Sequence, residues 1–212
     1  MLLSDIKNIT KGTVLENELM LKHTSYGIGG KVLAYIRPYD RYELIKIIKL
    51  INENNSEFYF VGSGSNLLVN DKKINAYIIT PAKALKSFSI KNNVIMAESG
   101  VMLGKIVKEA IKHNLTGLES LVGVPGTLGG ALKMNAGAWG EEISNYLVSV
   151  EVISYSGIIK TLYPSDIEFN YRYSSFKSNE FILSAKFKLT KTNDEEIKSK
   201  KLIASRGRIS SQ

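Results

Sequence analysis

Apolar residues recur along the chain at two spacings, one typical of helices and one typical of strands. Helical spacing runs through Tyr39–Asn54, with Asp40 as the expected N-cap, and again from Val101 to His113. Alternation of apolar and polar residues marks Phe181–Leu189 as a strand with one buried face. Further short strands are predicted at Val32–Arg37, Phe58–Val61, Ala76–Thr80, Val94–Glu98, Leu147–Ser154 and Ile158–Leu162. The pattern predicts an α+β fold.

The predicted elements divide near Pro81 into two groups of strands and helices. We expect one α+β subdomain in residues 1–80 and a second in residues 81–190. Residues 191–212 are charged and lose apolar content toward Gln212, so a helical, charged tail is predicted there.

A glycine-rich stretch, Gly123–Gly137, lies at the centre of the second group. It holds five glycines and Pro125 within fifteen residues, yet it is apolar in between. Gly129 and Gly130 are expected to open a short helix, Ala131–Asn135. Glycine allows close approach of the backbone to a ligand, and a helix N-terminus offers unpaired N–H groups to an anion. A phosphate cradle and a tight loop between packed elements both fit this spacing.

Two further segments are candidates for ligand contact. Gly62–Asn66 follows a short aromatic strand, but Leu67 stands where a Rossmann fingerprint needs its third glycine. An anion-binding nest and a plain loop remain open for this segment. In Phe169–Lys177, aromatic residues alternate with Arg, Ser and Lys; Arg172 carries a donor fork suited to a carboxylate, although an ordinary connection also fits.

Composition narrows the possible functions. The chain has no cysteine and only two histidines, so thiol chemistry, disulfides and a histidine metal cluster are excluded, and we expect no metal site. The absence of a long apolar run or a signal peptide predicts no membrane insertion, and the cytoplasm fits a chain without cysteine. The net charge of +8 lacks any nucleic-acid-binding motif around it, so we predict no nucleic-acid partner.

Four motifs, taken together and in order, resemble one enzyme family. They are Thr24–Gly30, Val61–Leu68, the segment from Gly117 to Gly140, and Tyr171–Lys177. The chain from about Leu21 to Leu189 thereby resembles the UDP-N-acetylenolpyruvoylglucosamine reductases. The resemblance implies a vanillyl-alcohol-oxidase-type (PCMH) fold of two α+β subdomains that grip non-covalent FAD. It also implies reduction of UDP-N-acetylglucosamine enolpyruvate to UDP-N-acetylmuramate with NADPH, in synthesis of the cell wall precursor.

The resemblance assigns roles to particular residues. Arg172 matches the family's catalytic arginine, which would stabilise charge next to the carboxylate of the UDP-sugar substrate. The residues expected to contact FAD are Val61, Gly62, Ser63, Gly64, Ser65, Asn66, Leu67, Gly123, Pro125, Gly126, Thr127, Gly129, Gly130, Asn135, Ala136 and Gly137.

The chain also departs from the family pattern. It stops at Gln212, where the family continues into a third, substrate-binding domain, and it contains no Ser-Ala-Gly-Ser segment to supply the proton donor. We therefore expect that domain to be absent or carried by a separate chain. The alternative to an active reductase is an FAD-binding remnant with impaired catalysis.

Overall fold

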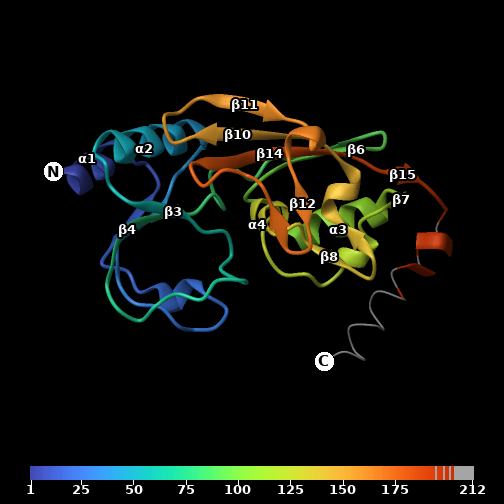
Figure 1. The fold of residues 1–212 in the computed structure, drawn as a ribbon, viewed down its shortest axis with the longest axis horizontal. Helices are drawn as coiled ribbons and strands as arrows, with labels where there is room; N and C mark the ends of the chain where they lie inside the picture. The colour runs from blue at the N-terminus through green and yellow to red at the C-terminus, as the bar shows by residue number, and fades with distance from the viewer. Residues whose placement is uncertain (194, 198, 201, 203–212) are drawn as a thin grey trace.

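The computed structural model describes residues 1–193, 195–197, 199, 200 and 202, and it is built around two β-sheets (Figure 1). The first sheet has four strands and the second has five. Helices cover both sheets, and the described part of the C-terminal segment runs away from the end of the second sheet. In the described residues, no helix combines the length and the apolar character needed to cross a membrane.

The first sheet has mixed strand directions. Its strands, in spatial order, are β1 (Thr13–Glu16), β2 (Val32–Arg37), β4 (Ile74–Ile79) and β3 (Phe58–Phe60). β1 runs antiparallel to β2, whereas β4 is parallel to both β2 and β3. Helix α2 (Arg41–Glu53) connects β2 to β3, and α1 (Leu2–Ile9) packs against α2. The carboxyl ends of three parallel strands therefore meet at one edge of this sheet.

The second sheet is antiparallel throughout. Its strands, in spatial order, are β11 (Ile159–Leu162), β10 (Leu147–Ser154), β14 (Glu180–Lys188), β6 (Val94–Glu98) and β5 (Phe88–Lys91). Helices α3 (Leu103–Lys112) and α4 (Leu128–Lys133) bury their apolar faces against it, together with residues of β6, β10 and β14. Burial of this apolar surface is the main stabilising contribution to the second half of the chain.

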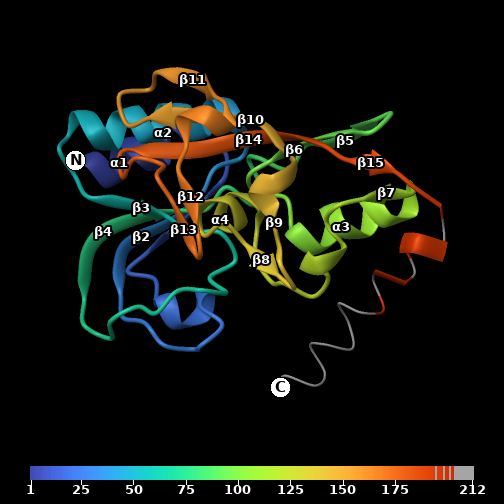
Figure 2. The same ribbon diagram turned by 45° about the vertical axis from the view of Figure 1, so that its right-hand side comes forward.

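Short elements surround the two sheets. Two of them are hairpins, β8 (Gly137–Ala138) with β9 (Glu141–Glu142) and β12 (Phe169–Asn170) with β13 (Tyr173–Ser174). A third strand pair joins β7 (Leu115–Thr116) to β15 (Thr190–Lys191). The described residues also form four 3-10 turns, η1 (Met20–His23), η2 (Glu119–Leu121), η3 (Ile143–Tyr146) and η4 (Pro164–Asp166). The β12–β13 hairpin lies next to α4 (Figure 2).

The two sheets share part of their core. Ile153 of β10 and both Phe181 and Leu183 of β14 belong to the apolar cluster that is centred on α2 and the first sheet. An ion pair between Arg41 of α2 and Glu151 of β10, 2.7 Å long, spans the same junction. Although each sheet falls on its own side of Pro81, this common cluster couples the two halves. The division into subdomains at residue 80 therefore stays a proposal.

Most elements expected from the apolar pattern are present. The bounds of β2, β6 and β10 agree with the expectation, and α2 begins after Asp40, whose Oδ1 accepts a hydrogen bond from the N–H of Glu43 at 2.8 Å. The expected helix Ala131–Asn135 is wrong in its bounds, because α4 begins three residues earlier and ends at Lys133. β1 and β5 were not expected, since each is a four-residue edge strand without strong alternation.

A buried carboxylate secures the start of α2. Glu43 is only 5% exposed, and its carboxylate accepts hydrogen bonds from the backbone N–H groups of Lys11, Gly12 and Tyr39 at 2.8, 3.2 and 2.9 Å. We expect Glu43→Ala to lower the free energy of unfolding by about 3 kcal/mol or more, because it leaves these buried donors without an acceptor. Glu43→Gln keeps one acceptor oxygen and should cost roughly half as much.

Urea unfolding of the two Glu43 variants and the parent chain measures this difference. A loss below about 0.5 kcal/mol in Glu43→Ala would contradict the assignment, since that is the range of ordinary surface substitutions.

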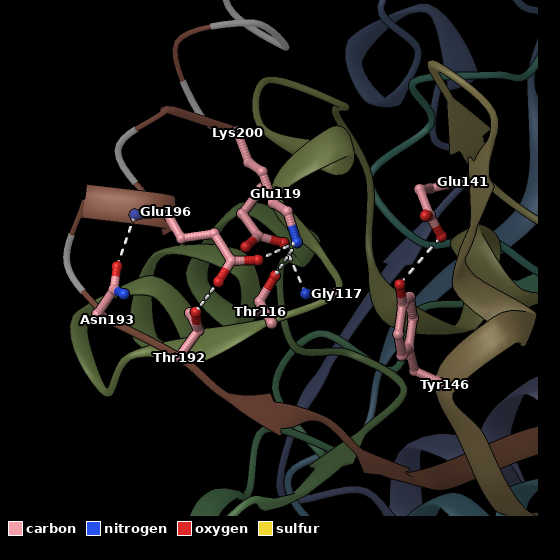
Figure 3. Close-up of polar contacts among 9 residues, drawn as sticks. All are labelled: Thr116, Gly117, Glu119, Glu141, Tyr146, Thr192, Asn193, Glu196 and Lys200. Atoms are coloured by element: carbon pink, nitrogen blue, oxygen red, sulfur yellow. Dashed lines mark hydrogen bonds and ion pairs between the residues drawn. The ribbon is translucent and has the colours of Figure 1, made fainter.

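The segment after β15 contacts β7. Residues 195–197, 199, 200 and 202 are helical, and Lys200 Nζ donates to Thr116 Oγ1 at 3.0 Å and pairs with Glu196 at 2.8 Å (Figure 3). The hydrogen bond with Glu196 raises the pKa of Lys200, and the charges of Glu119 and Glu141 act in the same direction. The helical tail expected over residues 191–212 lies partly outside the described residues.

Candidate functional site

Two adjoining clefts lie where the loop after β3 faces α4. The first, which we call the cradle cleft, has a volume of about 490 Å³ and is lined by residues 60–67, by residues of the central glycine-rich stretch and by Arg172. The second, the aromatic cleft, has a volume of about 330 Å³ and continues from it past Gly62, Thr127 and Lys133. The two clefts form one groove, because Phe60, Gly62, Thr127, Gly130 and Lys133 line both.

The loop between β3 and β4 has the shape of an anion cradle. In the described chain, the backbone N–H groups of residues 62–66 donate no hydrogen bond, so they remain available to a ligand. Gly64 has a φ of +67°, and a Cβ atom there would lie 1.9 Å from the carbonyl oxygen of His23. The loop therefore depends on glycine to pack against the end of η1, and the carbonyl of Gly64 accepts a hydrogen bond from the N–H of Ser25 at 3.1 Å. Successive free N–H groups in such a loop suit a phosphate.

The start of α4 differs from the expectation of free helix N–H groups. The N–H of Leu128 donates to Val101 O at 2.8 Å, and that of Gly129 donates to Ser99 O at 2.9 Å. Those two groups are already satisfied, so the sequence expectation is wrong for them. Gly129 instead permits close packing, since a Cβ atom there would approach Ser99 Cβ to 3.0 Å.

Two glycines, one on each side of the cradle cleft, lie where the β3 loop and the loop before α4 come close together. A Cβ atom on Gly62 would lie 2.3 Å from Thr127 Oγ1, so glycine is needed to let the β3 loop meet the N-cap of α4. Gly126 has a φ of +122°, a backbone conformation that favours glycine, and its missing side chain would face Ser65.

The structure brings most of the expected cofactor-contacting residues to the groove. Those that line it are Val61, Gly62, Ser63, Gly64, Ser65, Asn66, Leu67, Pro125, Gly126, Thr127, Gly129, Gly130 and Ala136. Gly123, Asn135 and Gly137 do not line either cleft. Asn135 is buried with a φ of +40°, and its Nδ2 donates to Glu142 Oε2 at 2.6 Å and to Asn170 O at 3.2 Å. Its side chain thus connects the segment directly after α4 to the two hairpins.

Arg172 projects into the cradle cleft from the turn of the β12–β13 hairpin. The hairpin pairs Phe169 with Ser174 and Asn170 with Tyr173, which leaves Tyr171 and Arg172 as a two-residue turn. Arg172 has a φ of +55°, which is uncommon for a residue other than glycine. Its guanidinium lies 5.4 Å from the ring centroid of Tyr171, and within the described residues it forms no ion pair with a carboxylate. The group is therefore free to meet an anionic ligand.

Lys133 is a site residue that the sequence reasoning missed. It lines both clefts, its Nζ donates to Phe176 O at 2.6 Å, and its own carbonyl accepts from Ser174 Oγ at 2.7 Å. Burial lowers the pKa of Lys133, against the raising effect of Glu180. Together with the bond from Asn135 to Asn170, these contacts hold the hairpin of Arg172 against α4. The only signal for Lys133 in the sequence was its position inside the glycine-rich stretch Gly123–Gly137.

We expect Lys133→Met to loosen this hairpin while α4 remains folded. Methionine keeps an apolar chain of similar length but leaves Phe176 O without its donor, which should lower the free energy of unfolding by about 1–3 kcal/mol. Hydrogen–deuterium exchange should increase over residues 169–177. Lys188→Met, at an exposed position on β14, is the control and should leave the exchange unchanged. Equal exchange in the parent chain and Lys133→Met would refute the positioning role.

The aromatic cleft is suited to a planar ring. Tyr59, Phe60, Tyr155, Phe176 and Phe181 line it, and the Phe60 and Phe181 rings stack with their centroids 3.4 Å apart. Ser99 also lines it and is fully buried, and its hydroxyl has no hydrogen-bond partner among the described residues. A buried hydroxyl without a partner is costly unless a ligand satisfies it.

Comparison with known proteins shows which families and enzymes the chain is similar to. The FAD binding domain family matches residues 32–163, more than half of the chain. The chain is 39% identical over 201 residues to the UDP-N-acetylenolpyruvoylglucosamine reductase of Caldanaerobacter subterraneus, covering 94% of the chain and 66% of that relative. It is 40% identical over 191 residues to the enzyme of the same name from Streptococcus mutans, covering 89% of the chain and 62% of that relative. The chain thus spans slightly less than two thirds of the length of these relatives.

Solved structures agree with the sequence relatives. The UDP-N-acetylenolpyruvylglucosamine reductase of Thermus caldophilus superposes with a TM-score of 0.78 at 27% identity, covering 93% of this chain and 69% of that one. A solvent-stable cholesterol oxidase superposes with a TM-score of 0.65 at 15% identity, which is a likeness of fold alone. The resemblance and the PCMH-type α+β fold predicted from the sequence are confirmed by these matches.

Proposed function

Since the chain belongs to the FAD binding domain family, we propose that it is the FAD-holding part of a UDP-N-acetylenolpyruvoylglucosamine reductase. The predicted cofactor, FAD, is confirmed by this family and by the similar reductases. The proposed reaction reduces UDP-N-acetylglucosamine enolpyruvate to UDP-N-acetylmuramate at the expense of NADPH, in peptidoglycan precursor synthesis. The observation that carries the proposal is the groove that joins the Gly62–Asn66 loop, α4 and Arg172 in a chain similar to these reductases over about nine tenths of its length.

The residues of the groove fit the cofactor. The free N–H groups of residues 62–66 suit its diphosphate, and the positive φ of Gly126 keeps this side of the cleft free of a side chain. The aromatic cleft offers flat apolar walls and the unpartnered Ser99 hydroxyl to a planar, polar-edged ring. None of the residues lining either cleft is a histidine or cysteine, in keeping with the predicted non-covalent FAD.

Bound FAD would supply hydride transfer, and the residues of the chain would orient the substrate and stabilise its charge. Arg172, whose guanidinium has no carboxylate partner, would pair with the substrate carboxylate. As hydride adds to the enolpyruvyl double bond, negative charge grows beside that carboxylate, and the fixed cation stabilises it. Lys133 and Asn135 would hold the Arg172 hairpin in place through the bonds to Phe176 and Asn170.

The proton donor of the reaction is not assigned to any of the 212 residues. We propose that it comes from outside them, whether from a longer form of the same chain or from a separate chain. Because NADPH and a nucleotide sugar are the proposed reactants, the proposed compartment is the cytoplasm.

A visible absorption spectrum of the purified chain tests the proposal. We expect a flavin spectrum that bleaches with anaerobic NADPH, and that recovers on addition of the enolpyruvyl substrate in the form of the protein that also supplies the proton donor. Bleaching without recovery would favour the alternative, an FAD-binding remnant without turnover. A purified chain that never takes up FAD would refute the proposal.

A further inference from the structure

A third pocket lies beside the two ends of the glycine-rich stretch Gly123–Gly137. It has a volume of about 180 Å³, and it shares no lining residue with the cradle cleft or the aromatic cleft. We call it the acidic pocket, because two carboxylates belong to its lining. The lining includes Thr116, Glu119, Trp139, Glu141, Tyr146 and Lys200.

The acidic pocket joins the two ends of one wall of the cradle cleft. Glu119 belongs to η2, which ends two residues before Gly123, whereas Glu141 belongs to the β8–β9 hairpin, which begins at Gly137. β8 of this hairpin packs against η2. Between these two ends, residues 124–127, 130, 131, 133, 134 and 136 line the cradle cleft. The position of this wall therefore depends on how the acidic pocket holds η2 and the hairpin together.

Glu119 brings a buried carboxylate oxygen without a partner to the acidic pocket. The residue is 4% exposed, and its Oε2 accepts a hydrogen bond from the N–H of Gly117 at 2.6 Å. Its Oε1 is buried and has no hydrogen-bond partner among the described residues. Burial of a charged group is costly unless a group of opposite charge lies near it. The pocket therefore favours a cation.

The second carboxylate of the acidic pocket is held by neighbouring side chains. Glu141 Oε2 accepts hydrogen bonds from Tyr146 OH and Asn145 Nδ2, each at 3.0 Å. Burial, the hydrogen bond to Glu141 and the charge of Glu119 raise the pKa of Tyr146 to about 12, so the phenol stays protonated and keeps donating. A Cβ atom on Gly117 would lie 2.7 Å from the Tyr146 ring, which shows how closely this ring packs on the segment before η2.

Lys200 is the cation that the structure places in the acidic pocket. It is the only lysine or arginine of the described lining. Its side chain reaches from the C-terminal segment toward Thr116 and Glu119, and Nζ donates to Thr116 Oγ1 at 3.0 Å and pairs with Glu196 at 2.8 Å (Figure 3). The segment is also anchored by the pairing of β15 with β7 and by Ile197, which is 2% exposed. One ammonium group thus links the C-terminal segment to both ends of the wall.

We propose that Lys200 is a positioning residue for the cofactor, because its ammonium group in the acidic pocket holds both ends of the glycine-rich wall in place. Lys200 lines neither the cradle cleft nor the aromatic cleft, so it acts through the wall and does not touch FAD. A wall that is already held in its binding conformation loses less entropy when the cofactor binds. The inference rests on the proposed function in one respect, which is that FAD occupies the cradle cleft.

This coupling works in both directions. If the docked C-terminal segment strengthens FAD binding by some factor, FAD strengthens the docking of the segment by the same factor, because coupling between two binding equilibria is reciprocal. The affinity for FAD and the protection of the segment are therefore two independent readouts of one effect.

Titration of the flavin-free chain with FAD, followed by flavin fluorescence, tests the inference. The test variant is Lys200→Gln, and we expect its Kd for FAD to rise at least about fivefold, the lower end of the usual coupling between two sites. The matched control is Lys191→Gln, an exposed position of β15 that removes the same charge from the same part of the chain. This control and Lys200→Arg, which keeps the charge, should both stay within about twofold of the parent chain.

A double-mutant cycle shows whether Lys200 acts through the acidic pocket. Glu119→Gln keeps an acceptor oxygen for the N–H of Gly117 but removes the negative charge. In the Glu119→Gln background, Lys200→Gln should raise the Kd for FAD by a smaller factor than in the parent chain, because the two side chains are coupled. An equal factor in both backgrounds would show that Lys200 does not act through Glu119.

Hydrogen–deuterium exchange gives the reciprocal readout, which a purely structural role of Lys200 would not change. FAD should slow exchange over residues 190–193 and 195–197 in the parent chain and in Lys191→Gln, but not in Lys200→Gln. If Lys200 only stabilised the fold, FAD would leave exchange over these residues unchanged in all three proteins, and that result would contradict the coupling.

Three results of the titrations would overturn the inference. They are an unchanged Kd for FAD in Lys200→Gln, equal weakening in Lys200→Gln and Lys191→Gln, and weakening in Lys200→Arg as large as in Lys200→Gln. Failure of the proposed function is seen separately, as a parent chain that takes up no FAD. In that case, exchange over residues 137–146 of the flavin-free proteins still decides whether Lys200 holds the wall, since equal exchange in Lys200→Gln and Lys191→Gln would rule this out.

Discussion

Replacing Gly126 with valine is expected to remove FAD from the purified protein. The φ of +122° at this position is strained for any residue with a Cβ atom, and a Cβ atom would lie 3.2 Å from Ser65 Oγ inside the cradle cleft. Backbone strain of this kind costs about 1–3 kcal/mol, and the branched side chain adds bulk where the cofactor phosphates are proposed to lie. Flavin absorbance per protein chain, after incubation with excess FAD and desalting, measures the loss.

Gly104→Ala is the matched control for Gly126→Val. A Cβ atom on Gly104 meets nothing within 4 Å, and the residue lies in α3, where alanine is favoured over glycine by up to about 1 kcal/mol. This variant should keep its FAD and unfold at an equal or higher temperature. If Gly126→Val proves unstable by circular dichroism, Gly126→Ala retains the backbone strain with less bulk. Full flavin occupancy in both Gly126 variants would contradict the cradle.

Replacing Arg172 with alanine is expected to leave FAD bound and to slow the substrate-dependent reaction by about 100- to 1,000-fold. This is the usual effect of removing one group that stabilises developing charge in the transition state. FAD should be retained, because only one side of the cradle cleft loses a side chain. Stopped-flow measurement of flavin reoxidation by the enolpyruvyl substrate, after reduction with NADPH, gives the rate. The assay requires whichever form of the protein supplies the proton donor.

Two further substitutions at Arg172 separate the effect of its side-chain charge from the effect of its backbone conformation. Arg172→Gly removes the guanidinium and also relieves the φ of +55°, so it should be as slow as Arg172→Ala but equally or more stable. Arg172→Lys keeps the charge without the planar fork and should fall between the parent chain and Arg172→Ala. Equal rates in the parent chain and Arg172→Ala would show that Arg172 does not stabilise the transition state.

Much of the fold could be predicted from local sequence because burial follows the periodicity of the regular elements. In α2, the apolar residues Leu44, Ile47, Ile48 and Ile51 are fully buried, as their helical spacing requires. In β14, alternation likewise placed Leu183 and Phe187 inside. Short edge elements such as β1 and β5 give no such signal, because few of their side chains are buried and their pairing depends on distant strands.

The candidate site could be predicted from the sequence only at positions where the residue type itself indicates an unusual backbone conformation or a close backbone contact. Glycines at 62, 64 and 126 indicated close approach, and the structure gives each of them a neighbour or a φ that requires glycine. At Gly129 the expectation of a free N–H group was wrong, since the N–H groups of Leu128 and Gly129 donate to Val101 O and Ser99 O. Sequence cannot show this, because the acceptors lie about thirty residues earlier in the chain.

The sequence alone determined the family resemblance, the strand and helix pattern, and the glycines that shape the cradle, because these depend on local residue type and spacing. The tertiary structure alone decided which residues meet. It brought Lys133 to the hairpin of Arg172, placed Ser99 in the aromatic cleft, and gathered Glu119, Glu141 and Lys200 in the acidic pocket. Each of these groupings joins residues far apart in the chain, and only the packing of the two sheets and their connecting loops brings such residues within contact distance.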